Sequence, residues 1–328
     1  PGSVLGIITD LTNAIRQNDL HSIKELLAQL GKTPFIKQEK PTPFDEAVSL
    51  TWYLENVFYE TAGEMMHYIQ KNILDGELPK NDILNLGFWP GGDRDGNPFV
   101  TTEITLKVAD RLRSSILKNY YIDIRKLKRK LTFIGVDTII SDIENKLYRS
   151  VFYSQGEIFI TLEELKDKLL QVKMLVSTKH QSLYIDEIDL LLNKVNLFGF
   201  HFATLDIRQN SKIHARVFDA IVSNKKTIFP ENYQTLSEDQ KLQFLSNVKS
   251  DLNENDFDDE VAKSTIGSIK AMKTIQENNG EKACNRYIIS NNESALHVFE
   301  TLSMFHLCGW QNPTVDIVPL FESVEEMK

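Results

Sequence analysis

Residues 87–98 read Gly87-Phe88-Trp89-Pro90-Gly91-Gly92-Asp93-Arg94-Asp95-Gly96-Asn97-Pro98, a glycine-rich charged segment inside a mainly helical sequence. The short apolar run 83–88 leads into it and predicts a buried strand. Such a strand would deliver a tryptophan, an arginine and two aspartates to its carboxyl end, where α/β barrels carry their chemistry. The glycines allow the backbone to approach a ligand closely. The segment is therefore the first candidate for a functional site.

The sequence on both sides of this segment has a helical pattern. Apolar residues recur at three- and four-residue spacing, with Gly31 as the expected C-cap of the second helix and Asp45 as the expected start of the third. The predicted helices are residues 5–17, 20–30, 45–73, 104–131, 136–151, 162–177, 184–195 and 294–307. The third has an apolar stripe expected to face the core, made of Val48, Trp52, Leu54, Val57 and Phe58.

Three later segments break the helical pattern and predict strands, namely Phe198–Ile207, Arg286–Ser290 and Val315–Phe321. Long helical tracts between isolated strands favour parallel strands joined by helical crossovers. Four strands are too few to close an eight-stranded barrel. We therefore expect a predominantly α-helical fold with a few parallel strands, which form an incomplete portion of an α/β barrel.

We expect one continuous unit with two parts along the chain. Residues 1–80 would form an N-terminal helical segment, and residues 81–328 a partial barrel with long helical insertions. The chain begins with Pro-Gly-Ser instead of methionine and stops soon after a strand-like run. We therefore expect it to be an internal piece of a longer protein.

Bulk composition narrows the class of protein. The chain has 328 residues, 41% of them hydrophobic and 25% charged, and a net charge of −9 that argues against a nucleic-acid partner. No apolar stretch approaches the roughly 18 residues of a membrane span, and no signal peptide is visible. Cys284 and Cys308 lie in apolar surroundings without metal-binding spacing, so we expect reduced thiols in a cytoplasmic protein.

Two arginines are candidates for binding an anion. Arg208 follows the predicted strand 198–207, beside Asp206, which could fix its guanidinium group. A guanidinium group matches phosphate or carboxylate bidentately. Arg94 follows another predicted strand, so the two arginines could converge on one phosphate. The alternative is that each forms a structural ion pair.

Other residues near strand ends have weaker signals. Glu322 follows an apolar strand and could bind a divalent metal, or else pair with a helix N-terminus. His214 begins a helix after Arg208 and could face the same site or lie in the core. A calcium loop starting at Asp93 fails, because Pro98 and Ile104 occupy positions that require glycine and glutamate. A capped turn is the structural alternative for that loop.

Read together, these motifs resemble phosphoenolpyruvate carboxylase. Residues 89–98 look like the W-x-GGDRDGNP segment of that family, and 198–214 look like its FG…LDIRQ…H stretch. Residues 286–290 and 318–322 resemble its YVIS and VPLFE segments, respectively. Upstream, the helix around Asp45-Glu46-Ala47 is similar as well. The motifs follow one another in the order of the family.

The resemblance implies carboxylation of phosphoenolpyruvate by bicarbonate to oxaloacetate and phosphate in the cytoplasm, with Mg²⁺ or Mn²⁺. It implies that Arg208 holds the phosphate and that Glu322 is one of two metal carboxylates. The expected substrate-binding set is Trp89, Arg208, Gln209 and His214, and the expected catalytic set is Arg208, Arg94 and Asp95. It also implies a homotetrameric, allosteric parent enzyme and no membrane or nucleic-acid partner.

The sequence departs from the family pattern at several points, which bear on whether this chain can be active by itself. Pro90 stands where the family often has methionine, and Asn210 where it usually has glutamate. The TAHPTE segment with the catalytic histidine is not in the chain, nor is the GRGGxxGRGG arginine loop. We therefore expect the isolated chain to be inactive. The alternatives are another phosphoenolpyruvate- or pyruvate-handling barrel enzyme, or a non-catalytic helical scaffold.

Overall fold

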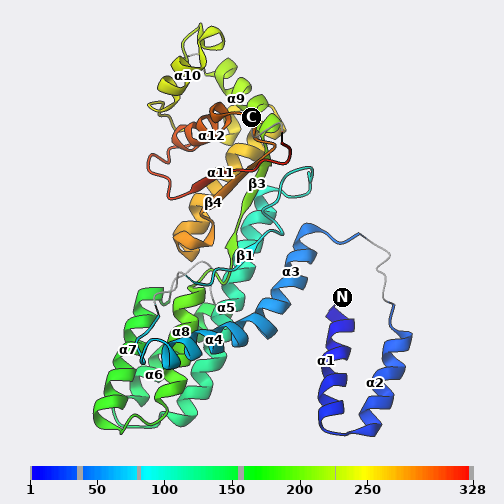
Figure 1. Cartoon of the computed structure of the whole chain (residues 1–328), viewed down its shortest axis with the longest axis vertical. Helices are drawn as coiled ribbons and strands as arrows, with labels where there is room; N and C mark the ends of the chain where they lie inside the picture. Colours follow the sequence, from blue (N-terminus) through cyan, green and yellow to red (C-terminus); the bar gives the residue numbers. More distant parts are fainter. Residues whose placement is uncertain (1, 35–39, 80–82, 154–158, 226, 325–328) are drawn as a thin grey trace.

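The computed structural model describes residues 2–34, 40–79, 83–153, 159–225 and 227–324. Figure 1 shows an elongated molecule with a helical body at one end and a body that contains the main sheet at the other. Helices α1 (Gly2–Arg16) and α2 (Leu20–Lys32) form a hairpin that stands apart from both. The fold is predominantly α-helical with a few parallel strands, as predicted.

The helical body is formed by the helices between residues 43 and 198. It contains α3 (Pro43–Tyr53), the π-helical turn η1 (Leu54–Phe58), α4 (Tyr59–Asn72), α5 (Thr102–Lys130), α6 (Asp137–Phe152), α7 (Leu162–Lys179) and α8 (Ile185–Phe198). Helix α3 packs on α5, and α4 packs on α8. The expected division at residue 80 therefore crosses this body. None of the helices in the described part of the chain is long and apolar enough to cross a membrane.

Two predicted helix boundaries were wrong, and the capping contacts explain why. Helix α3 begins at Pro43 with Thr42 as N-cap, because Thr42 and Asp45 form a reciprocal capping box that places Asp45 inside the first turn. Helix α2 continues through Gly31, and Thr33 is its C-cap. The other predicted helices are found within one to three residues at most ends.

The expected apolar stripe of the third helix was partly wrong. Leu54 is buried, but Val57 and Phe58 are 43% and 45% exposed. The turn η1 is π-helical, so one extra residue per turn shifts the faces of the helix that follows. Tyr59 and Met66, on α4, are therefore the residues buried against the body.

All strand pairs in the described residues are parallel, as predicted. Strand β1 (Gly87–Phe88) pairs with β2 (Thr204–Leu205), and β3 (Ile207–Asn210), β4 (Arg286–Ser290) and β5 (Asp316–Pro319) form a sheet in that order. A bridge between Asp93 and Arg208 continues the first pairing toward the second sheet. Strands β1, β2 and β3 thus lie along the connection between the two bodies (Figure 1).

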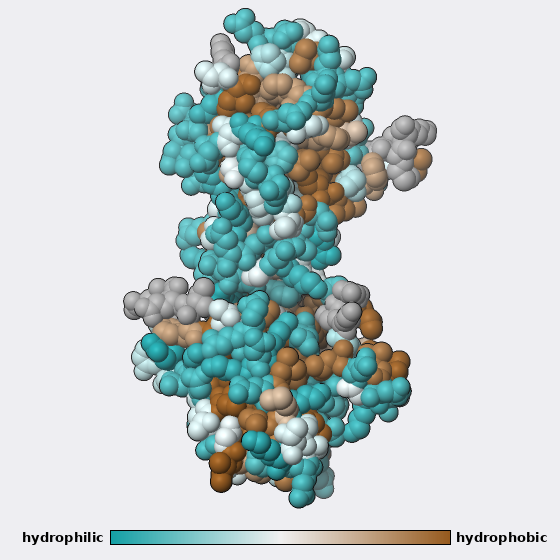
Figure 2. Space-filling model, turned by 90° about the vertical axis from the view of Figure 1, so that its left-hand side faces the viewer, coloured by the Kyte–Doolittle hydropathy of each residue, from teal (hydrophilic) through white to brown (hydrophobic). Residues whose placement is uncertain are grey.

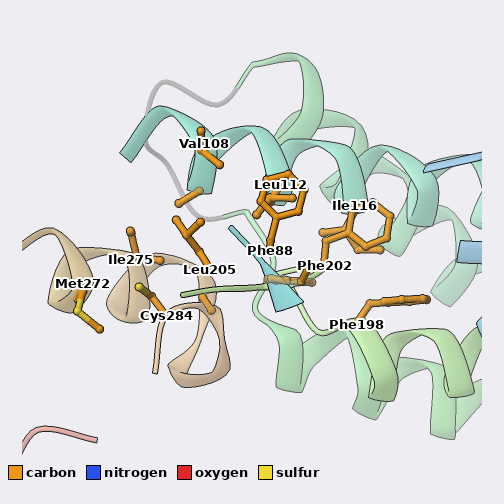
Figure 3. Packing of buried hydrophobic residues seen from close by; sticks show 14 of the residues in the cluster. Phe88, Val108, Leu112, Ile116, Phe198, Phe202, Leu205, Met272, Ile275 and Cys284 are labelled. Carbon is orange, nitrogen blue, oxygen red and sulfur yellow. The ribbon is translucent and has the colours of Figure 1, made fainter. Parts of the chain in front are cut away.

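The predicted strand Phe198–Ile207 was wrong in its first half. Phe198 ends α8, and the chain then turns through Gly199 and Phe202, which have positive φ values of 50° and 65°. The aromatic residues follow one another because Phe198 and Phe202 both fill the core at the end of the helical body, each 1% exposed. Figure 3 shows them beside Phe88 and Ile116.

The three-stranded sheet has one covered face. Helices α9 (Ser211–Asn224), α11 (Glu260–Asn279) and α12 (Ala295–Leu307) contact one another; α9 contacts β3, and α12 contacts β5. Ile207, Tyr287 and Ile289 are fully buried toward these helices. The alternating residues Arg208 and Val318 face the other side, because successive side chains of a strand point to opposite faces.

Hydrophobic packing joins the two bodies at the base of the sheet. Val108 and Leu112 from α5 lie near Leu205, while Ile275 and Cys284 approach from the other body (Figure 3). Both cysteines are free and buried, as predicted. Figure 2 shows hydrophobic atoms on the surface of both bodies and mainly hydrophilic atoms at the narrower middle.

A buried carboxyl on α12 makes stability depend on pH. Glu300 is 9% exposed, and burial, together with the charge of Asp219, raises its pKa to about 7. The folded state therefore holds this proton up to about pH 7, whereas the unfolded chain releases it near pH 4.3. The stability that protonated Glu300 contributes is complete below that lower pH and is lost as the pH rises through about 7.

We expect Glu300→Gln to remove this loss. At pH 8 the variant should be more stable than the unaltered chain by about 1–3 kcal/mol, and at pH 4 the difference should largely vanish. Urea unfolding at the two pH values measures the effect. The matched control is Glu293→Gln, an exposed glutamate just before the same helix, for which we expect a pH-independent change below about 0.5 kcal/mol. Equal pH profiles for both variants would refute the assignment.

Candidate functional site

The loop that contains residues 89–98 is fixed to β3 by its backbone. The amide of Arg208 donates to the carbonyl of Gly92 (3.0 Å), and the amide of Arg94 donates to the carbonyl of Arg208 (2.9 Å). Gly92 is needed for this contact, since a Cβ there would lie 2.0 Å from the carbonyl oxygen of Asp206. The loop therefore places the side chains that follow Gly92 at a defined point on the strand.

Arg208 is the centre of the site. Its Nη2 lies 2.9 Å from Oε1 of Glu322 and 3.2 Å from Oδ2 of Asp95. Its Nε lies 3.9 Å from Asp93, and its guanidinium carbon lies 5.7 Å from the centre of the Trp89 ring. The structure thus brings together Trp89, Asp95, Arg208 and Glu322, which come from three separate segments of the sequence.

Neighbouring hydrogen bonds hold the partners of Arg208 in place. The hydroxyl of Ser290 donates to Oδ2 of Asp95 (2.6 Å). The expectation that Asp206 fixes the guanidinium group of Arg208 was wrong. Asp206 instead accepts hydrogen bonds from Nε1 of Trp89 (3.2 Å) and from Nε of Arg286 (2.8 Å). Burial raises the pKa of Asp206, and these two donors oppose that effect only in part.

Ser290 and Arg286 are the residues that sequence reasoning missed at this site. Both lie in the predicted strand 286–290, one at each end. A polar residue at a strand end was the feature of the sequence that could have indicated them. Nothing in the sequence linked them to a particular carboxylate, because those contacts depend on the register between β3 and β4. Arg208 is in fact paired with Ile288, so Ser290 lies two residues further along.

Arg94 and Arg208 have different surroundings in the structure, so their contacts give no support to a convergence on one phosphate. Arg208 and Gln209 are consecutive in β3 and point to opposite faces. Arg94 lines a cavity together with Gln209 and Ser264, and its Nη2 is hydrogen-bonded to the hydroxyl of Ser264 on α11. Its guanidinium group therefore lies on the helix-covered side of the sheet, away from Glu322.

His214 also lies on the covered side. The ring is completely buried, its centre lies 5.3 Å from that of Tyr287, and neither nitrogen has a hydrogen-bond partner in the structure. Burial, with smaller contributions from the charges of His297 and Arg94, lowers the pKa of His214 to about 3. The imidazole is therefore neutral at physiological pH and does not meet the Arg208 side of the sheet.

The site around Arg208 combines a guanidinium group that can bind an anion with carboxylates that can bind a cation. Three carboxylates, Asp93, Asp95 and Glu322, lie within 4 Å of one guanidinium group. Carboxylate oxygens suit Mg²⁺, which often takes only one or two of them beside water and substrate phosphate. In the described ranges no three His, Cys, Asp or Glu side chains are arranged to hold a metal ion by themselves. Glu322 and Asp95 thus fit part of a metal site.

An arginine held by carboxylates on a strand of a parallel sheet is typical of α/β enzymes that handle phosphate or carboxylate groups. Comparison with known proteins identifies the family within this class. The family model of phosphoenolpyruvate carboxylase matches residues 7–151 and 137–328. The chain belongs to the phosphoenolpyruvate carboxylase family.

Curated relatives agree with this assignment. The chain is 26% identical to the phosphoenolpyruvate carboxylase of Prochlorococcus marinus strain MIT 9215, over 97% of the chain and 39% of the relative. It is 25% identical to that of Shewanella halifaxensis over 97% of the chain and 40% of the relative, and 24% identical to that of Trichormus variabilis over 90% and 35%. The chain thus spans about two fifths of the length of these relatives.

Proposed function

We propose that this chain supplies one wall of the active site of a phosphoenolpyruvate carboxylase, which converts phosphoenolpyruvate and bicarbonate to oxaloacetate and phosphate. The observation that carries the proposal is the meeting of Trp89, Asp95 and Glu322 around Arg208 on β3. The family match over most of the chain supports it and gives no support to a non-catalytic scaffold or another barrel enzyme. The isolated chain is proposed to be inactive.

Arg208 is proposed to bind the phosphate group. Its forked donors can hold two phosphate oxygens at once and stabilise the negative charge that spreads over them during transfer. Asp95, itself held by Ser290, fixes the guanidinium group from one side, and the Trp89 ring lies against it. For phosphate to bind, the contact between Arg208 and Glu322 has to open.

Glu322 is proposed to hold a divalent ion, Mg²⁺ or Mn²⁺. What a bound ion supplies in such a site is charge stabilisation at a substrate oxygen. Glu322 is then removed from Arg208, which leaves the guanidinium donors free for phosphate. Asp95 stays hydrogen-bonded to Ser290 and keeps Arg208 in position.

The sheet is proposed to be part of an α/β barrel. Its strands lie in sequential order, all parallel, with α9, α11 and α12 on one face and Arg208 on the other. That order and that one-sided cover are typical of a barrel wall, whose inner face carries the site. We further propose one continuous unit within a homotetrameric, allosteric and cytoplasmic enzyme.

The test is Arg208→Gln in the complete enzyme that contains this chain. We expect kcat/KM for phosphoenolpyruvate to fall at least about 100-fold, because a charged donor to the transferring group is lost, and Arg208→Lys to be intermediate because it keeps the charge but not the fork. The control is Arg216→Gln, an exposed arginine on α9 paired with Asp259, which should retain full activity. Unchanged kinetics in Arg208→Gln would reject the proposal.

A further inference from the structure

A second cavity lies on the helix-covered side of the sheet, opposite the Arg208 site. Its volume is about 530 Å³, and its wall includes Thr101, Gln209, Ser264 and Thr265 together with Arg94. The family assignment and the proposed carboxylase site leave this cavity unexplained. Its wall is formed by the starts of several helices, which determines its electrostatic character.

Three helices begin around this cavity. Their N-caps are Thr101 for α5, Asn210 for α9 and Asp259 for α11. Each N-cap side chain accepts a hydrogen bond from one backbone amide in the first turn of its helix. The other amides of the first turn have no partner within the helix and point out of its end. Helix N-termini carry partial positive charge and bind anions. A second observation inside the cavity wall is independent of these helix ends.

That observation is the guanidinium group of Arg94. Arg94 is only 8% exposed, and its Nε and Nη1 have no hydrogen-bond partner. In the described part of the chain no carboxylate forms an ion pair with it, and burial lowers its pKa. A buried charge without a counter-ion is costly, and the unpartnered hydroxyl of Thr265 lies in the same wall.

Two acidic groups at the start of α11 are paired with other cations. Glu260 lies 2.7 Å from Lys263, and Asp259 lies 3.0 Å from Arg216. Neither of these contacts involves Arg94. Positive charge is therefore in excess at the cavity, in contrast to the Arg208 site, where carboxylates are in excess.

We propose that this cavity is a second anion site, which binds a small oxyanion, a phosphate or carboxylate group, between Arg94 and the first turns of α5 and α11. The bound oxygens would accept from the unpartnered Arg94 donors and the Thr265 hydroxyl. This site is separate from the proposed phosphate site at Arg208, because the two arginines lie on opposite faces of β3. It does not depend on the carboxylase proposal.

The test is a titration of the isotope-labelled chain 1–328 with inorganic phosphate, followed by the amide resonances of individual residues in nuclear magnetic resonance spectra. Chloride keeps the ionic strength constant, and a parallel titration with acetate distinguishes a carboxylate from a phosphate preference. We expect the amide signals of Val261 and Thr265 to move with saturation. Signals of Ile288 and Ser290 report separately on the Arg208 site, so failure of one site is distinguishable from failure of the other.

Two variants make the assignment specific. Arg94→Gln should weaken the affinity reported by Thr265 at least about tenfold, while Arg208→Gln should leave it within twofold. Ser264→Asp places a carboxylate beside Arg94 and should abolish the response of Thr265 in a chain that retains its fold. Absence of a response in the unaltered chain, or an undiminished response in either Arg94→Gln or Ser264→Asp, would overturn the proposal.

Discussion

Gly92→Ala should destabilise the chain by more than about 4 kcal/mol, a size reached by few single substitutions. A Cβ at this position would lie 2.0 Å from the carbonyl oxygen of Asp206, which is backbone and cannot rotate away as a side chain can. The loop would have to leave β3 and lose the two backbone hydrogen bonds between Gly92, Arg94 and Arg208. Urea unfolding followed by circular dichroism measures the change.

The matched control is Gly96→Ala in the same loop. Gly96 has φ +66°, but a Cβ there would meet nothing within 4 Å. The expected cost is only the left-handed backbone strain of alanine, about 1 kcal/mol. If both variants lost similar stability, close approach to Asp206 would not be the reason for the glycine at position 92.

The comparison of Gly92 with Gly96 shows what the sequence could and could not predict about this loop. The glycines and charged residues marked the loop as unusual. The distance between Gly92 and Asp206 depends on how two distant segments pack, which no local pattern contains. The sequence therefore does not distinguish the two glycines, although their structural roles differ.

Local patterns predicted most of the helices and the strands at 286–290 and 316–319, because periodicity and capping act within a few residues. The predicted helices did not include α10 (Glu238–Leu245) or α11, and of the apolar run 83–88 only Gly87–Phe88 form a strand. The aromatic run that begins at Phe198 was misread, since residues that fill a core at a turn have the same composition as a strand. The π-helical turn at 54–58 was also missed, because it changes the phase of a helix without changing its composition.

Some members of the candidate site could be named from the sequence, but its geometry could not. From the sequence, Arg208 could be predicted to bind an anion and Glu322 to bind a metal ion, and the structure brings the two side chains together. Arg94 was grouped with them because it also follows a strand. Which face of the sheet a side chain meets depends on the pleat and on the path of the loop, so the separation of Arg94 from Arg208 required the structure.

A buried ion-pair cluster in the helical body has no counterpart in the sequence signals. Lys194 on α8 is 2% exposed, and its Nζ lies 2.9 Å from Asp123 on α5 and 2.6 Å from Glu60 on α4. Tyr59 donates to the same carboxylate of Asp123 (2.9 Å). Helix α4 can approach because Gly63 has no Cβ, which would lie 2.7 Å from the Lys194 stem. One lysine thus links three helices.

Lys194→Met should destabilise the chain by about 3–5 kcal/mol, because it keeps the apolar stem but leaves Asp123 buried without its main counter-ion. Thermal and urea unfolding measure the loss. The double variant Lys194→Met/Asp123→Asn removes both charges while Tyr59 can still donate to the amide oxygen. We therefore expect it to be more stable than Lys194→Met alone by at least about 1 kcal/mol. If the second substitution only added to the loss, the pair would contribute through packing and not through charge.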